Sequence, residues 1–143
     1  MNFLIIGSGN IALRHQSNLR QLSSDANISV LTNKKRYSSK KKERLNCFDN
    51  IFFERSEIPS EKLDAAFICS PSVHHIEDAI YFAEKNVHLF IEKPLSNNLD
   101  GIQDFLEVIK RKEIIATVGY PLRFNKSMIE FKKIISSKRI GRI

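Results

Sequence analysis

Short apolar runs recur along the chain and are separated by longer, more polar segments. Each run is apolar at nearly every position and is bounded by polar or turn-forming residues. This pattern is typical of strands that are buried on both faces of a sheet. We therefore predict strands at residues 2–6, 28–32, 64–69, 87–91 and 114–118, with a weaker sixth strand at 50–53.

Between the predicted strands, apolar residues recur every three or four positions. This spacing predicts amphipathic helices that each pack one face against the sheet. His15 lies on such a face, and we expect it to pack against the sheet with its ring nitrogens hydrogen-bonded. The three faces comprise Ile11, His15, Leu19 and Leu22; Val73, Ile76, Ile80 and Ala83; and Ile102, Phe105, Leu106 and Ile109.

Polar residues at the ends of these patterns predict where the helices begin and end. Ser72 precedes the second helix, and Asn98 or Asp100 precedes the third, in positions where a side chain accepts from the first turn. Asn86 follows the second helix, as expected for a left-handed end residue. Strands alternating with helices predict an α/β fold with a doubly wound parallel sheet of the Rossmann type.

The pattern changes after residue 120. PLRFN at 121–125 predicts a turn, and Asn125 is expected to cap a further helix. A chain of 143 residues is the size of one domain. We predict a dinucleotide-binding domain over 1–120 and a connecting helix over 121–143 that leads into a second, truncated domain. The apolar face of the connecting helix would comprise Met128, Phe131, Ile134 and Ile135.

The segment GSGNIA at residues 7–12 links the first strand to the first helix. Unpaired N–H groups and the helix dipole make such a turn an anion site. Gly7 would allow the tight turn, Gly9 would let the backbone approach a diphosphate, and Ala12 would replace the third glycine of the dinucleotide pattern. The alternative is an ordinary strand–helix turn that uses two glycines.

Charge changes the interpretation at the end of the second strand. NAD sites usually carry an acidic residue there, whereas this chain has Thr32 or Asn33, followed by Lys34, Lys35 and Arg36. A small polar residue backed by cations accepts a 2′-phosphate, so the sequence favours NADP as cofactor, with NAD as the alternative. The alternative is that these three basic residues are simply the start of a solvated helix over 34–46.

The net charge of +7 also raises the hypothesis of an anion-binding or nucleic-acid-binding module built on the basic tract 34–44. Apart from Tyr37 the tract lacks the aromatic residues that stack bases, so we predict no nucleic-acid partner. The apolar run at the N-terminus is too short for a signal peptide or a membrane span, which predicts a cytoplasmic protein with no membrane partner. Cys47 and Cys69 are isolated, so neither a disulfide nor a metal site is expected.

Two polar clusters follow the fourth and fifth strands, where ligands collect in doubly wound sheets. In CSPSVHH (69–75), Ser70 and Pro71 would form a turn beside the cofactor with His74 on the first helical turn; His74 and His75 are equally well interpreted as exposed helix residues. In EKPLS (92–96), Lys93 would point into the crevice with Glu92 orienting it. Its ammonium would hydrogen-bond a carbinol oxygen and aid proton transfer during hydride exchange.

Several motifs together resemble one known family. The chain resembles the N-terminal half of the glucose-fructose oxidoreductase and inositol dehydrogenase family (Gfo/Idh/MocA). The motifs that carry the resemblance are GSGNIA followed by Arg14-His15, Pro71 with His74, His88, EKPLS and VGYPLRFN. The resemblance runs through nearly the whole chain.

The resemblance implies an NAD(P)-dependent oxidoreductase that acts on a sugar, nucleotide-sugar or cyclitol alcohol. It implies that Lys93 is catalytic near the nicotinamide, with a cis Lys93–Pro94 bond, and that Arg123 lies at the entrance to the second domain. It also implies a homo-oligomeric full-length protein, while this chain should bind cofactor better than it turns over substrate. A non-catalytic dinucleotide sensor is the alternative. Implied cofactor contacts are Gly7, Gly9, Asn10, Ile11, Ser70, Pro71, His74 and Glu92.

Overall fold

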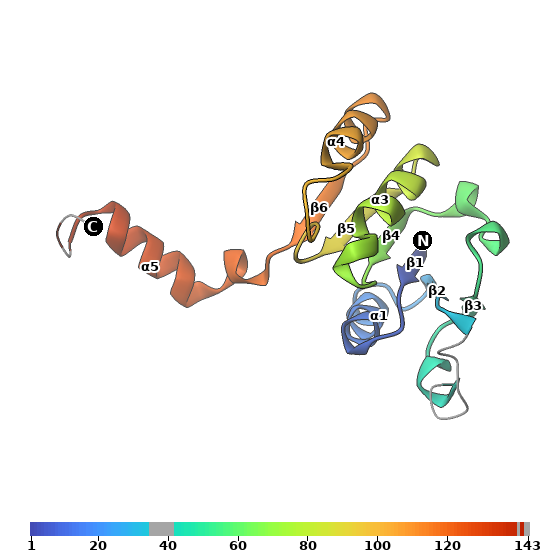
Figure 1. Cartoon of the computed structure of the whole chain (residues 1–143). Helices are drawn as coiled ribbons and strands as arrows, with labels where there is room; N and C mark the ends of the chain where they lie inside the picture. The colour runs from blue at the N-terminus through green and yellow to red at the C-terminus, as the bar shows by residue number, and fades with distance from the viewer. Residues whose placement is uncertain (35–41, 140, 142–143) are drawn as a thin grey trace.

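Six parallel strands form one sheet in the order β3-β2-β1-β4-β5-β6 (Figure 1). The computed structural model describes residues 1–34, 42–139 and 141. The order reverses between β1 and β4, which is the arrangement of a doubly wound dinucleotide-binding sheet and confirms the predicted fold class. The strands are β1 (Asn2–Ile6), β2 (Asn27–Leu31), β3 (Asn50–Phe52), β4 (Ala65–Ile68), β5 (His88–Glu92) and β6 (Ala116–Gly119).

Helices cover both faces of this sheet. Alternate residues of β1 face opposite sides: Ile5 packs with Ala12 of the first helix, whereas Leu4 packs with Phe82 on the other face, and all four are fully buried. This alternation explains why the strands are apolar at every position. The helices are α1 (Asn10–Leu22), α3 (His75–Glu84), α4 (Ile102–Arg111) and α5 (Lys126–Ser136), with short 3-10 turns at Glu43–Leu45, Arg55–Glu57, Ser60–Lys62, Ser72–His74 and Pro121–Phe124.

Three positions assigned to buried helix faces are exposed. Leu22 is the last residue of α1, Val73 lies in the 3-10 turn that precedes α3, and Leu106 of α4 faces solvent. For Leu22 and Val73 the prediction was wrong because the helical period was extended past the buried part of the helix. Leu106 lies within α4, between the buried Phe105 and Val108, and is itself exposed. The remaining residues of each face are buried or partly buried.

Two of the predicted helix caps were also wrong. Ser72 begins the 3-10 turn, so α3 starts after His74 without a side-chain cap. The residue before α4 is Gly101, in the left-handed conformation, while Asn98 donates to the carboxylate of Asp100 within the preceding turn. Asn86 is left-handed, with φ 61°, as predicted for the end of α3.

The expected basic helix over 34–46 lies mostly outside the described residues, as do Lys35 and Arg36. Of its length, the structure describes Lys34 and the segment that follows residue 41, where Glu43–Leu45 form a 3-10 turn. Leu45 is buried against the face of the sheet that α1 covers. The helix over 34–46 therefore stays a prediction.

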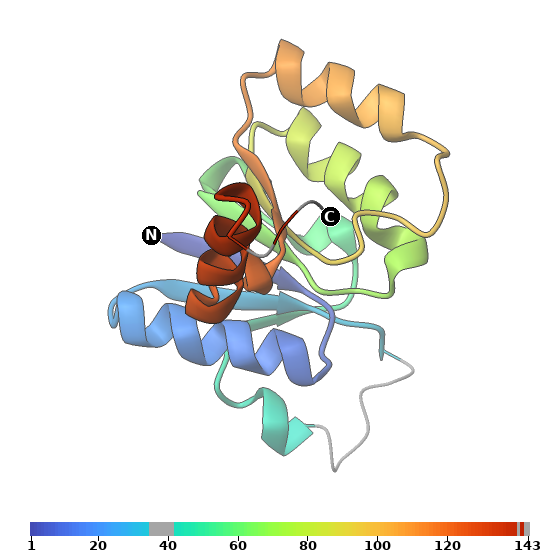
Figure 2. The same ribbon diagram turned by 90° about the vertical axis from the view of Figure 1, so that its left-hand side faces the viewer.

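The connecting helix α5 projects away from the sheet (Figure 1), and Figure 2 shows the same helix end-on in front of it. Asn125 caps it as predicted, because its side-chain oxygen accepts from the N–H of Met128 at 3.1 Å. Half of the predicted apolar face is exposed: Met128 is 44% and Phe131 is 52% exposed, whereas Ile134 and Ile135 are partly buried. The exposed half of this face is not buried by any described part of the chain.

Candidate dinucleotide site

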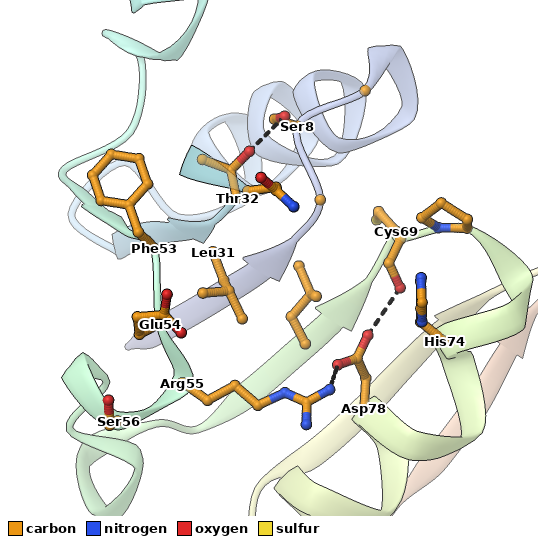
Figure 3. A pocket seen from close by; sticks show the side chains of 16 residues that line it. Ser8, Leu31, Thr32, Phe53, Glu54, Arg55, Ser56, Cys69, His74 and Asp78 are labelled. Atoms are coloured by element: carbon orange, nitrogen blue, oxygen red, sulfur yellow. Dashed lines mark hydrogen bonds and ion pairs between the residues drawn. The ribbon is translucent and has the colours of Figure 1, made fainter. Parts of the chain in front are cut away.

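A cleft of about 850 Å³ lies at the carboxyl ends of β1, β2 and β4, beside the point where the strand order reverses (Figure 3). Ligands bind in this position in doubly wound sheets. The glycine turn, the end of β2 and the turn after β4 form its walls. Seven of the residues predicted to bind a cofactor line the cleft: Gly7, Gly9, Thr32, Asn33, Ser70, Pro71 and His74.

The two glycines of the turn serve different purposes. Gly7 has φ +106°, and a Cβ there would lie 2.7 Å from the carbonyl oxygen of Cys69, so any side chain would push the turn away from β4. A Cβ at Gly9 would meet nothing within 4 Å, so this position opens into free space. The backbone at Gly9 is thus accessible to a ligand as bulky as a diphosphate.

The N-terminus of α1 begins at this open position. It has no side-chain cap and no acidic residue in its first turn, so its N–H groups suit an anion. The side-chain oxygen of Asn10 accepts from Arg44 Nη2 at 2.6 Å. Arg44 adds a cation beside the glycine turn, and the sequence did not reveal it because 34 residues separate it from Asn10.

Thr32 holds the glycine turn in place by a side-chain hydrogen bond. It is only 6% exposed, and its hydroxyl donates to the hydroxyl of Ser8 at 2.8 Å. This bond ties the end of β2 to the glycine turn, as Figure 3 shows. Asn33 and Lys34 follow it and are exposed. The described residues at the end of β2 therefore include no carboxylate.

A charged network forms the opposite wall. Arg55 donates to Asp78 at 2.6 Å, as Figure 3 shows, and to Glu77 at 2.8 Å. Asp78 also accepts from the hydroxyl of Ser70 at 2.9 Å. Burial opposes the charge of Arg55, but these carboxylates outweigh it and raise the pKa of the guanidinium. The network fixes the turn after β4, and sequence patterns gave no signal for Arg55, which precedes Asp78 by 23 residues.

A smaller pocket of about 350 Å³ adjoins the cleft, because Cys69 and Ser70 line both. Ile11, Glu92 and Lys93 line this second pocket together with Pro94. Lys93 is exposed, and the Lys93–Pro94 peptide bond is cis, as the family resemblance implies. The structure thus brings the turn after β4 and the predicted lysine to adjoining pockets.

Glu92 lies between α1 and the second pocket. Its Oε1 is 2.8 Å from Nε2 of His15, whose ring packs against Phe67 and Phe90. The expectation that His15 packs against the sheet with a bonded ring is confirmed. The other carboxylate oxygen of Glu92 accepts from the backbone N–H of Lys93 at 3.3 Å. Glu92 therefore contacts the main chain of the lysine and not its ammonium group.

The neighbouring histidines differ from the interpretation as two exposed residues. His74 is exposed and lines the cleft, but His75 is 1% exposed and lines the smaller pocket. His75 is buried because the 3-10 turn at Ser72–His74 delays the start of α3 and rotates residue 75 toward the sheet.

Among the described residues, four other predicted contacts line neither pocket: Asn10, Ala12, Lys34 and Arg123. Ala12 is fully buried, where it allows α1 to pack closely on the sheet, and Arg123 is exposed in the 3-10 turn before α5. Within the described ranges, no group of three or more His, Cys, Asp or Glu side chains is placed to hold a metal ion, and both cysteines are free. No helix described here is long and apolar enough to cross a membrane.

Comparison with known proteins decides the family. Residues 1–120 match the model of the Gfo/Idh/MocA group, described as an oxidoreductase family with an NAD-binding Rossmann fold. The chain belongs to this family. It is 27% identical over 142 residues to myo-inositol 2-dehydrogenase of Thermotoga maritima, covering 99% of this chain and 42% of that protein. Members of the family identified by sequence thus include dehydrogenases of cyclic polyols.

Solved structures agree with this family assignment. Myo-inositol 2-dehydrogenase from Lactobacillus plantarum superposes with a TM-score of 0.83 at 26% identity, covering all of this chain and 43% of that one. A probable dehydrogenase from Thermotoga maritima gives 0.78 at 28% identity, covering 99% of this chain and 42% of that one. This member of the family therefore spans less than half the length of these relatives.

Proposed function

We propose that this chain is the cofactor-binding portion of an NAD(P)-dependent oxidoreductase. The reaction would transfer a hydride between the nicotinamide and the alcohol carbon of a sugar, nucleotide sugar or cyclitol. The observation that carries the proposal is the open backbone at Gly9, where the uncapped α1 meets a cleft large enough for a dinucleotide. The named activities of the inositol dehydrogenase relatives favour a cyclitol among these substrates.

Each wall of the cleft would hold a different part of the dinucleotide. The N–H groups around Gly9 and Asn10 would bind the diphosphate, and the turn at Ser70 and Pro71, with His74, would contact a ribose. Ile11 and Glu92 would lie beside the nicotinamide end. When bound, the nicotinamide supplies the carbon that donates or accepts the hydride.

Lys93 is the proposed catalytic residue. It is exposed at a strand end, next to the pocket that adjoins the cleft. Its Nζ would donate a hydrogen bond to the substrate oxygen and hold the proton that this oxygen gains or loses. Because the chain spans under half the length of its relatives, we expect it to bind cofactor and to turn over substrate poorly without the groups of a second domain, at whose entrance Arg123 would lie.

The proposed cofactor preference is for NADPH over NADH. Asn33 and Lys34 follow β2, and none of the described residues there carries a carboxylate that would repel a 2′-phosphate. Arg36, outside the described residues, would add to the same preference. The NAD-binding description of the family and a scyllo-inositol dehydrogenase structure containing NAD(H) keep NADH as the alternative.

Titration calorimetry with NADPH and NADH tests the proposal on the chain and on Gly9→Asp. A carboxylate at this position would repel the diphosphate, so affinity should fall by about 100-fold. Aspartate is also a favourable first residue for a helix, so the free energy of unfolding should stay the same or rise. Asn18→Asp adds the same charge on an exposed part of α1 and should leave affinity within about twofold of wild type.

The same titrations distinguish the alternatives. Dinucleotide binding should weaken only moderately with salt, whereas a nucleic-acid module would lose affinity steeply. If Gly9→Asp binds as tightly as the unmodified chain, the proposed site is wrong. If NADH binds as tightly as NADPH, the site stands and only the preference for NADPH fails.

A further inference from the structure

His75 contacts the ends of two neighbouring strands at once. Its Nε2 lies 2.7 Å from the carbonyl oxygen of Ser70, which follows β4, and its Nδ1 lies 2.9 Å from the carbonyl oxygen of Pro94, which follows β5. The side chain is almost completely buried. One ring therefore connects the turn that lines the cleft to the segment that carries Lys93.

The chemistry of these two contacts determines the protonation of the ring. A carbonyl oxygen only accepts hydrogen bonds, so each ring nitrogen must carry a hydrogen for both contacts to be hydrogen bonds. Neutral imidazole has a single N–H, and its other nitrogen would direct a lone pair at a carbonyl oxygen. Both bonds form together only when the ring is doubly protonated, and two carbonyl acceptors compensate for burying its charge.

The carboxylates around His75 have partners of their own. In the small pocket it faces the Cys69 thiol, the Glu92 carboxylate and the Lys93 ammonium. Glu92 is bonded to His15 of α1. On α3 itself, the carboxylates of Glu77 and Asp78 both accept from Arg55. The two carbonyl oxygens thus make the direct hydrogen bonds to the ring.

We propose that His75 is a positioning residue that, as a doubly protonated ring, joins the Ser70 turn to the Lys93–Pro94 segment. The inference deepens the proposed function, because it would couple the cofactor-binding turn to the position of the catalytic lysine. Loss of one ring proton breaks one of the two bonds and so removes this connection between the two segments, while the Ser70 hydroxyl keeps its bond to Asp78. The spacing between cleft and lysine would then depend on pH.

Nitrogen NMR of the histidine side chains in the 143-residue chain tests this proposal without any cofactor. Near neutral pH, His75 should show two protonated ring nitrogens, with scalar couplings across both hydrogen bonds to the Ser70 and Pro94 carbonyl carbons. His74, the neighbouring exposed histidine, provides the internal reference. A spectrum in which one His75 nitrogen carries no proton would overturn the proposal.

Amide hydrogen exchange of His75→Gln provides the second measurement. The glutamine amide can donate to only one of the two carbonyl oxygens. Exchange should therefore accelerate by about tenfold or more at hydrogen-bonded amides of the released segment, which are Lys93 on one side or Cys69 and His74 on the other. In the unmodified chain, the protection of these amides, measured as the intrinsic exchange rate divided by the observed rate at each pH, should fall over the pH range in which the His75 spectrum shows loss of a proton. His74→Gln is the matched control and should change these rates by less than about twofold.

Two results would contradict the coupling. One is unchanged exchange at both segments in His75→Gln; the other is a change of amide protection with pH that does not follow the His75 spectrum. If His75→Gln fails to fold, the nitrogen spectrum and the pH dependence of the unmodified chain still decide the question. Failure of dinucleotide binding would leave these readouts intact, so the two proposals are tested separately.

Discussion

At the scale of single residues, burial separates side chains of the same type. Cys69 follows β4 between the two pockets and is 9% exposed, whereas Cys47 is exposed. Burial, together with the nearby carboxylate of Glu92, raises the pKa of the Cys69 thiol to about 12. Because the thiolate is the reactive form, Cys69 should be chemically inert although it adjoins the site.

We predict that a thiol-specific disulfide reagent labels only Cys47 in the folded chain at mildly alkaline pH. Cys69 should react only when the chain unfolds, and Cys47→Ser should remove the rapid reaction. Rapid labelling of Cys69 in folded Cys47→Ser would contradict the assignment.

The same pKa shift affects stability. The folded chain holds the Cys69 proton more tightly than the unfolded chain, whose thiol has the ordinary value of 9.0. This contribution to the free energy of unfolding is therefore present below pH 9 and is lost as pH rises toward 12. Cys69→Ala should lack this part of the alkaline decline in urea unfolding, and Cys47→Ala should keep it.

At the scale of elements, contact with the sheet decides which positions of an amphipathic helix are buried. Leu19 and Leu22 lie on the same predicted face of α1, one turn apart. Leu19 is 8% exposed because it packs over the sheet, whereas Leu22 ends the helix and is 84% exposed. A helical period alone does not reveal where the sheet ends beneath the helix.

These two leucines form a matched pair for mutagenesis. Leu19→Ala removes buried methyl groups and leaves a cavity, so it should lower the free energy of unfolding by about 2–5 kcal/mol. Leu22→Ala removes the same atoms from solvent and should change it by less than about 0.5 kcal/mol. Urea denaturation measures the free energy of unfolding of both variants. Equal effects would show that α1 does not pack on the sheet through Leu19.

At the scale of the whole molecule, the sheet and α5 differ in how far their apolar side chains are buried. The sheet has a packed core on each face, while α5 and the turn before it carry exposed apolar side chains. Phe124 is 82% exposed and Leu122 is 62% exposed. An apolar surface of this kind is typical of a surface that another protein segment covers.

We predict that Phe124→Ser together with Phe131→Ser reduces both self-association and the binding of an apolar fluorescent dye. The free energy of unfolding should change by less than about 0.5 kcal/mol for each substitution, because both side chains are exposed. Sedimentation and dye titration provide the measurements, and Lys132→Ser on the same helix is the control. A large loss of stability would mean that α5 packs against the sheet.

Much of the fold was predictable from local patterns. The strands were placed within two residues of their observed ends because fully buried parallel strands are apolar throughout. The roles of Gly7 and Gly9 in the turn were also predictable, since the strand–turn–helix context limits what glycines do there. Cofactor contacts and the catalytic role of Lys93 stay predictions, as does the division of the chain near residue 120.

The order of residues by itself determined the α/β class, the position of the cleft at the carboxyl ends of the strands and the family, because these depend on periodicity and on short contiguous motifs. Only the tertiary structure revealed the contacts between distant segments: Arg44 with Asn10, Arg55 with Asp78, and His75 with Pro94. Such pairs form because the fold brings together segments that are far apart in the sequence. The spacing of residues along the chain does not show which of these segments will lie close together in space.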